Sequence, residues 1–124
     1  MSNAPTVLMG LVPLIRAVVR SATTDTATTV TPDDSGTLFV NLGTSAHAYT
    51  LPAVAAGAGK CFMFFNADGT STISVASTAA NLKAHDATAT TMLSSTTGIG
   101  DCLLIIGDGT YYYGIEIYGT WGNT

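Results

Sequence analysis

Charged side chains are scarce in this chain, and their scarcity argues against several functions. Only 10% of the 124 residues are Asp, Glu, Lys or Arg, against about 25% in an average soluble domain. The first twenty residues carry Arg16 and Arg20 and no acid, whereas residues 21–124 carry two lysines against eight acids. Phosphate neutralisation needs clustered Lys and Arg. We therefore expect no direct nucleic-acid binding by the main body of the chain.

Cysteine is also rare, with Cys61 and Cys102 as the only two. Each lies in an apolar, strand-like run. A free cysteine behaves as a small hydrophobic residue and is among the most buried residue types. Two buried free thiols are therefore the preferred interpretation. A cross-strand disulfide is the alternative, which the sequence alone does not decide.

The most hydrophobic segment outside the expected strands is residues 6–19, TVLMGLVPLIRAVV. It is too short to cross a bilayer, which takes about twenty apolar residues, so we expect no membrane partner. No basic residue precedes it, Pro13 and Arg16 interrupt it, and no clear small-residue cleavage pattern follows, which disfavours a signal peptide. Pro13 also excludes a central paired strand position. The segment is either a first core strand or an extended arm that docks on another protein, and the arm is preferred.

In place of charge the chain has hydroxyl groups, with 21 Thr and 9 Ser, together with 13 Gly. Thr is β-branched and Gly is costly inside a helix, so this composition favours strands and turns. Short strand patterns recur about every ten residues, with turn residues between them. The expected strands are 37–42, 47–51, 60–66, 71–76, 102–106 and 111–118, with one or two irregular strands between 77 and 98.

This spacing predicts one all-β domain, an antiparallel β-sandwich or barrel of about seven or eight short strands with an extended N-terminal arm. The expected organisation is an apolar arm over residues 1–22 and a sandwich or barrel body over residues 23–124. The centre of the body is expected at 100–121, where a GDGT turn joins two strands. The first of these strands, 102–106, has no polar face, which suits a central strand covered on both sides.

No recognisable catalytic or metal-binding pattern is present. No nucleophile-elbow glycine pattern surrounds a serine. His47 and His85 have no second ligand at a metal-site spacing, and solvent-facing polar side chains are the preferred interpretation of both. Asp33, Asp34 and Asp108 lie in turns that lack the twelve-residue calcium-loop pattern, so ordinary turn chemistry is preferred there. We expect a non-enzymatic protein with no cofactor and no metal.

Aromatic side chains gather near the C-terminus. Tyr112, Tyr118 and Trp121, together with Tyr111 and Tyr113, are numerous enough for a sugar-stacking platform. Packing in the core or at an interface is the alternative explanation of the same cluster. The packing alternative is preferred, and Tyr112, Tyr118 and Trp121 are kept as candidate glycan or interface residues.

The turns and aromatic strands of residues 30–121 follow a characteristic order. The matching features are Ser35-Gly36 before a strand, Leu51-Pro52 closing the next, an aromatic strand at 62–65, and GDG at 107–109 before an aromatic strand that ends in GTW at 119–121. In these features the chain resembles the small β-rich structural modules of tailed bacteriophages. Such modules occur in head decoration (cement) proteins and in some head-fibre and tail-fibre proteins.

The resemblance implies a virion structural protein that binds the outer surface of a phage capsid, contacts the major capsid protein and stabilises the lattice. It also implies a symmetric oligomer, most often a homotrimer. A receptor- or glycan-binding module of a phage fibre is the alternative. The apolar arm would lie over neighbouring subunits, with its arginines near acidic capsid groups. The candidate partner-binding residues are Val7, Leu8, Leu11, Leu14, Ile15, Arg16, Val18 and Arg20.

Overall fold

The structure is a computed structural model, and it describes residues 18–24, 26–68, 70–84, 88–95 and 98–123. Within these residues the chain forms eleven short strands and two 3-10 helices. The strands are β1 (Val18–Ala22), β2 (Ala27–Thr29), β3 (Thr37–Asn41), β4 (His47–Thr50), β5 (Cys61–Asn66), β6 (Ile73–Ala76), β7 (Leu82–Lys83), β8 (Met92–Ser95), β9 (Cys102–Gly107), β10 (Tyr112–Tyr118) and β11 (Trp121–Asn123). The 3-10 helices are η2 (Pro32–Asp34) and η3 (Val54–Gly57).

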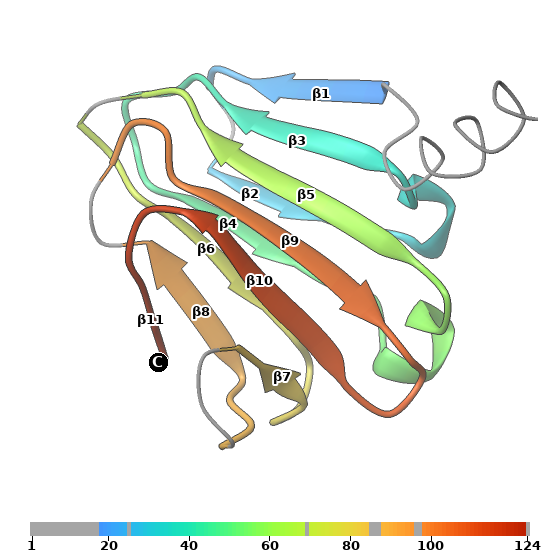
Figure 1. The fold of residues 1–124 in the computed structure, drawn as a ribbon. Helices are drawn as coiled ribbons and strands as arrows, with labels where there is room; N and C mark the ends of the chain where they lie inside the picture. The colour runs from blue at the N-terminus through green and yellow to red at the C-terminus, as the bar shows by residue number, and fades with distance from the viewer. Residues whose placement is uncertain (1–17, 25, 69, 85–87, 96–97, 124) are drawn as a thin grey trace, which may run out of the picture.

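The strands form two open sheets that pack face to face (Figure 1). The first sheet has the order β1-β3-β5-β9-β10-β7, and the second has the order β11-β8-β6-β4-β2. Each sheet ends in two edge strands, so the fold is a sandwich and not a closed barrel. The prediction of an all-β sandwich is confirmed, although the described residues alone contain more strands than the seven or eight expected.

The predicted antiparallel arrangement is wrong, because both sheets are mixed. β1, β3 and β5 are parallel neighbours in the first sheet, and β2, β4 and β6 are parallel neighbours in the second. The chain therefore alternates between the sheets and winds through three coils, β1–β2, β3–β4 and β5–β6, as repeat proteins of the solenoid type do. The direction reverses only later, where β9 runs antiparallel to β5 and β8 runs antiparallel to β6.

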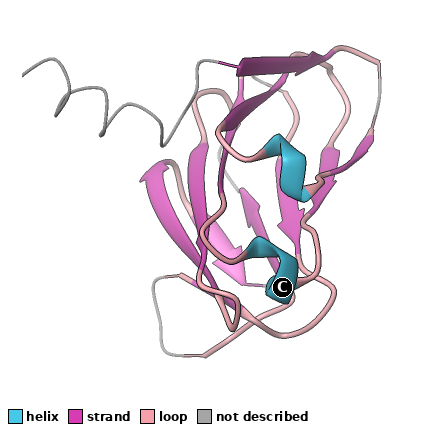
Figure 2. Cartoon of the chain, turned by 90° about the vertical axis from the view of Figure 1, so that its right-hand side faces the viewer, coloured by secondary structure: helices cyan, strands magenta, loops and turns pink. Residues whose placement is uncertain are grey.

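Two connections that return from the second sheet to the first have the same structure, because each contains a 3-10 helix. η2 lies between β2 and β3, η3 lies between β4 and β5, and both 3-10 turns occupy the same side of the sandwich (Figure 2). Val30 and Leu51 begin these connections, and each is 1% exposed. The Val30 N–H donates to the Thr50 carbonyl and the Leu51 N–H to the Ala76 carbonyl, both at 2.8 Å. Successive coils are thus hydrogen-bonded at the same point.

The opposite corners, where the chain leaves the first sheet, are built on two buried asparagines. Asn41 ends β3 and Asn66 ends β5, and the two residues are in register. The Asn41 Oδ1 accepts from the Gly43 N–H at 3.1 Å and the Asn66 Oδ1 from the Asp68 N–H at 3.3 Å, so both side chains close the same kind of turn. The Asn41 Nδ2 donates to the Asn66 Oδ1 at 3.1 Å and to the Ser71 Oγ at 3.1 Å, which links consecutive coils.

The hydrophobic core lies between the two sheets. Phe39 and Phe64 of the first sheet stack at a ring-centroid distance of 5.4 Å, and Tyr49 of the second sheet packs against Phe64 at 4.9 Å. The other buried members of the core are Val30, Leu51, Phe62, Ile73, Val75, Leu82, Leu93, Leu103, Ile105, Tyr112 and Trp121. At about 1.5–3 kcal/mol for each large apolar side chain removed from water, this layer is the main favourable contribution to folding.

The predicted N-terminal arm falls in two parts. Residues 1–17 lie outside the described residues, and with them six of the eight candidate partner-binding residues. Residues Val18–Ala22 form β1, an edge strand that pairs in parallel with β3. Val18 is in register with Thr37 and Arg20 with Phe39. The backbone of the last two candidates therefore belongs to the first sheet.

Candidate functional site

β9 lies in the middle of the first sheet, between β5 and β10, which is the central position predicted for it. Leu103 and Ile105 point into the core, and both are fully buried. Cys102, Leu104 and Ile106 point to the opposite, outer side of the sheet. The absence of a polar face in this strand therefore produces an apolar outer surface as well as an apolar core.

The neighbouring strands extend this surface. The pairing of β3 with β5, β5 with β9 and β9 with β10 aligns their outward residues in rows across the sheet. We call this surface the apolar face, and its members are Leu38, Val40, Cys61, Met63, Phe65, Cys102, Leu104, Ile106, Tyr113, Ile115 and Tyr118. None of these eleven side chains is charged, and the tyrosine hydroxyls are the only oxygen atoms among them.

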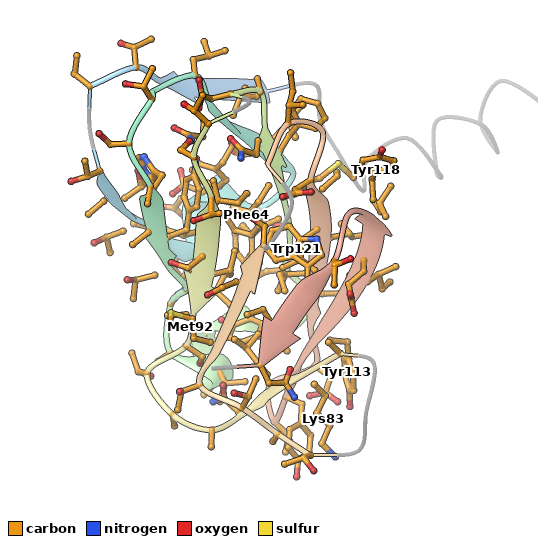
Figure 3. The ribbon with its side chains drawn as sticks, turned by 90° about the vertical axis from the view of Figure 1, so that its left-hand side faces the viewer. Phe64, Lys83, Met92, Tyr113, Tyr118 and Trp121 are labelled. Carbon is orange, nitrogen blue, oxygen red and sulfur yellow. The ribbon has the colours of Figure 1, made fainter. Side chains whose placement is uncertain are left out.

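The exposed large apolar side chains of the described residues concentrate on this side of the molecule. On β10, Tyr113 is 40% exposed, Ile115 48%, Ile117 50% and Tyr118 63%. Ile117 lies at a β-bulge between Glu116 and Tyr118, where the register with β9 shifts. Figure 3 shows Tyr113 and Tyr118 projecting from one side of the sandwich, with Phe64 and Trp121 between the sheets.

One end of the apolar face carries a small polar rim. The Asp108 Oδ1 accepts from the Thr110 and Tyr111 backbone N–H groups at 2.8 and 2.7 Å, which is the expected turn chemistry. The Tyr113 hydroxyl donates to the Asp108 Oδ2 at 2.7 Å. The backbone bonds hold the pKa of Asp108 below its usual value, and the bond to Asp108 raises the pKa of Tyr113. The Lys83 Nζ lies 4.2 Å from the centre of the Tyr111 ring.

The outer face of the second sheet has the opposite character. On β2, β4 and β6 the outward side chains are all small or hydroxyl-bearing. On β8 they are Ser94 and Met92, and Met92 is the one large apolar side chain of the set. The outward residues of β2, β4, β6 and β8 are Ala27, Thr29, Ala48, Thr50, Ser74, Ala76, Met92 and Ser94. The hydroxyl-rich composition is thus concentrated on one side of the sandwich, and the large apolar side chains on the other.

Two of the three candidate glycan or interface aromatics are in the core. Tyr112 is fully buried and its hydroxyl donates to the Pro52 carbonyl at 2.8 Å, while burial raises its pKa to about 12. Trp121 is 2% exposed, and its Nε1 donates to the Tyr118 carbonyl at 3.1 Å. The three aromatic residues therefore do not form a stacking platform, and Tyr112 and Trp121 pack in the core. Tyr118 alone is available to a partner, at 63% exposure.

The prediction for His47 is wrong, whereas the one for the two cysteines is confirmed. His47 is 1% exposed, so its interpretation as a solvent-facing residue is wrong. Its ring packs on Tyr49 at 4.3 Å and its Nε2 lies 2.7 Å from the Thr28 Oγ1, which makes it a polar member of the core. His85 lies outside the described residues. Cys61 and Cys102 are both buried and are not joined in a disulfide, which is the preferred interpretation.

The sequence contains a signal for the apolar face that no single strand shows. β5 has apolar side chains on both faces, and so does β9. A single strand of this kind is explained by a central position. Two such strands side by side, flanked by Leu38 and Val40 on β3 and by Ile115 on β10, indicate that a whole sheet lies between two apolar layers.

Within the described residues, no three His, Cys, Asp or Glu side chains come together in a group that could hold a metal ion. No helix in the same part of the chain is both long and apolar enough to span a membrane. Neither a protein-family model nor a curated protein sequence matches the chain. The functional argument therefore depends on the geometry of the sandwich and its two unlike outer faces.

Proposed function

We propose that this chain is a non-enzymatic structural protein of a virion, a decoration protein that binds the outer surface of a tailed-phage capsid and stabilises its lattice. Its partners in this proposal are the major capsid protein and other copies of itself, arranged as a homotrimer. The phage assignment comes from the resemblance of residues 30–121. The observation that carries the structural role is the apolar face, because an uncharged sheet surface of this size suits a protein that works while covered by neighbours.

The position of β1 supports a separate role for the N-terminal segment. β1 is an edge strand that begins at Val18, so residues 1–17 precede it directly in the sequence. A segment attached there can reach a neighbouring protein without disturbing the coils. Its apolar side chains, listed above as candidates, would bury on the capsid while Arg16 meets acidic groups. The body and the binding segment then have distinct tasks.

The test uses particles of the virus that encodes the chain. Mass spectrometry of purified particles should find the protein at a stoichiometry set by the lattice. A variant lacking residues 1–17 keeps all of β1, so it should remain folded and fail to co-sediment with particles that lack the native protein. Normal binding by this variant contradicts the proposed role of the segment. Absence of the protein from particles contradicts the virion assignment itself.

A receptor- or glycan-binding module is the second candidate, and the exposure of Tyr118 favours it. An aromatic ring at 63% exposure on a rigid strand can stack on a sugar face. Under this alternative, Tyr118→Ala abolishes attachment to cells while the particles remain intact. Met92→Ala, on the opposite face, is the control and leaves attachment unchanged. Equal attachment by both variants contradicts the alternative.

A further inference from the structure

We propose that the apolar face is the self-association surface of this protein, and that it packs against the same face of other copies of the chain. The inference deepens the self-association part of the proposed function and does not depend on a capsid partner. In a dimer two such faces lie sheet on sheet, and in a trimer three of them meet around the axis. In either arrangement the contact covers mainly Tyr113, Ile115 and Tyr118, because Cys61, Cys102 and Leu104 are already buried within the chain.

The first step of the argument is that this face is built like the interior of a sandwich. A sheet with one face in water normally alternates apolar and polar side chains. The second sheet does so, with Ala, Ser, Thr and a single Met92 outside and Ile73, Val75 and Leu93 inside. The first sheet has large apolar side chains on both faces across four adjacent strands. Its composition is therefore that of a sheet covered on both faces, by the second sheet on one side and by another protein on the other.

The second step is the size of the face. Four strands at a spacing of about 4.8 Å, each about six residues long at 3.3 Å per residue, cover roughly 20 by 20 Å, or on the order of 400 Å² in plan. Leu42, 47% exposed, and Ile99, 64% exposed, add to the apolar surface of the molecule. Two such faces in contact cover about 800 Å² in plan, which approaches the roughly 1,000 Å² that a specific interface needs.

The third step is the choice of occupant. The eleven side chains present no charge and few hydrogen-bonding atoms, so they carry little of the pattern that selects one unlike partner over another. Interfaces between identical subunits are the more apolar class. The charged groups near the face, Lys83 and Asp108, lie at its rim, where water still reaches them. Another copy of the same face is thus the partner that this chemistry fits best.

The test is sedimentation velocity of the full-length protein over a range of concentrations, for the wild type and for two variants. Ile115→Lys places an ammonium group on β10, at the most exposed end of the row of outward residues that crosses the apolar face. Met92→Lys places the same group on the outer face of the second sheet (Figure 3), and it is the matched control. We expect a wild-type oligomer, an Ile115→Lys protein whose association is at least about 100-fold weaker, and a Met92→Lys protein that associates like the wild type.

Three results overturn the inference. The first is a wild-type protein that stays monomeric at all concentrations, which excludes a second copy as the occupant of the face. The second is an oligomer that Ile115→Lys leaves intact, which places self-association elsewhere. The third is equal disruption by both lysine variants. Circular dichroism and a cooperative thermal transition confirm folding, and Ile115→Thr, which keeps a β-branched residue, replaces Ile115→Lys if the lysine variant does not fold.

The outcome is separable from that of the proposed function. Binding of each variant to capsid particles is measured in the same preparations. If Ile115→Lys becomes monomeric but the wild type is absent from particles, the self-association surface stands and the virion assignment fails. If the wild type binds particles as a monomer, the virion assignment stands and the self-association surface fails.

Discussion

At the scale of single residues, the Tyr112 side chain fits in the core because Gly57 and Gly107, which lie against it, have no side chain. A Cβ on Gly107 would collide with the Gly57 carbonyl and would come within 2.9 Å of the Tyr112 Cε1. We expect Gly107→Ala to lower the free energy of unfolding by about 3 kcal/mol, because the backbone of η3 would have to move. Gly122→Ala, where a Cβ meets nothing within 4 Å, should change it by less than about 0.5 kcal/mol. Urea denaturation of both variants distinguishes them, and equal stability contradicts the packing described.

The buried hydroxyl of Tyr112 gives the protein a pH dependence in the alkaline range. Burial raises its pKa from 10.0 to about 12, so the folded state favours the neutral phenol. The corresponding stability is fully present below pH 10 and is lost as the pH rises from 10 to 12, because the unfolded chain ionises first. Tyr112→Phe should cost about 1 kcal/mol at pH 7, through loss of the bond to Pro52.

The same variant should also lose less stability than the wild type between pH 10 and 12. Thermal denaturation at several pH values measures both effects. The remaining tyrosines titrate in both proteins and cancel in the difference. Parallel pH profiles for the two proteins contradict a raised pKa at this position.

At the scale of elements, the asparagine pair tests whether the coils depend on one another. Asn41→Ala leaves the Gly43 N–H without its acceptor and removes the bond to Asn66, both in buried surroundings. We expect a loss of about 2 kcal/mol for this variant. With Asn66→Ala as the second mutation, a double-mutant cycle by urea denaturation should give a coupling of about 0.5–3 kcal/mol. Ser45→Ala, exposed in the neighbouring turn, is the control. Additive effects contradict a shared network.

The position of each strand follows from the local sequence pattern, whereas the pairing of the strands does not. β3, β5, β9 and β10 are predicted to within a residue or so, because a run of apolar and β-branched residues between turn residues is a property of one segment. Whether adjacent strands run parallel depends on which sheet the chain enters next, and no local pattern records that choice. β7 and β8 lie between 77 and 98, where one or two irregular strands are expected, whereas β11, of three residues, is too short to show alternation. The apolar face was missed because it belongs to four strands together. His47 was misplaced because its burial depends on contacts with Thr28 and Tyr49.

At the scale of the whole molecule, β1 brings residues 18–22, expected as the end of the arm, into the first sheet. Removal of residues 1–17 should leave cooperative unfolding intact, because every described strand remains. Removal of residues 1–22 also deletes β1 and uncovers the edge of β3. We expect that variant to be less stable by at least about 2 kcal/mol, because the five paired positions between β1 and β3 are lost. Urea denaturation compares the two deletions. Equal behaviour contradicts a stabilising role for β1.

The coiled path of the first six strands has a consequence for how the chain reaches its native state. Partners in adjacent coils are separated by 19 to 26 positions in sequence, whereas β5 and β9 pair residues that are 37 to 45 positions apart. Contacts between nearer positions lose less chain entropy when they form. As the chain leaves the ribosome, the coils can stack one upon the next before the final strands have been synthesised. β8 and β9 then pair antiparallel with β6 and β5, and no further coil can stack on that side.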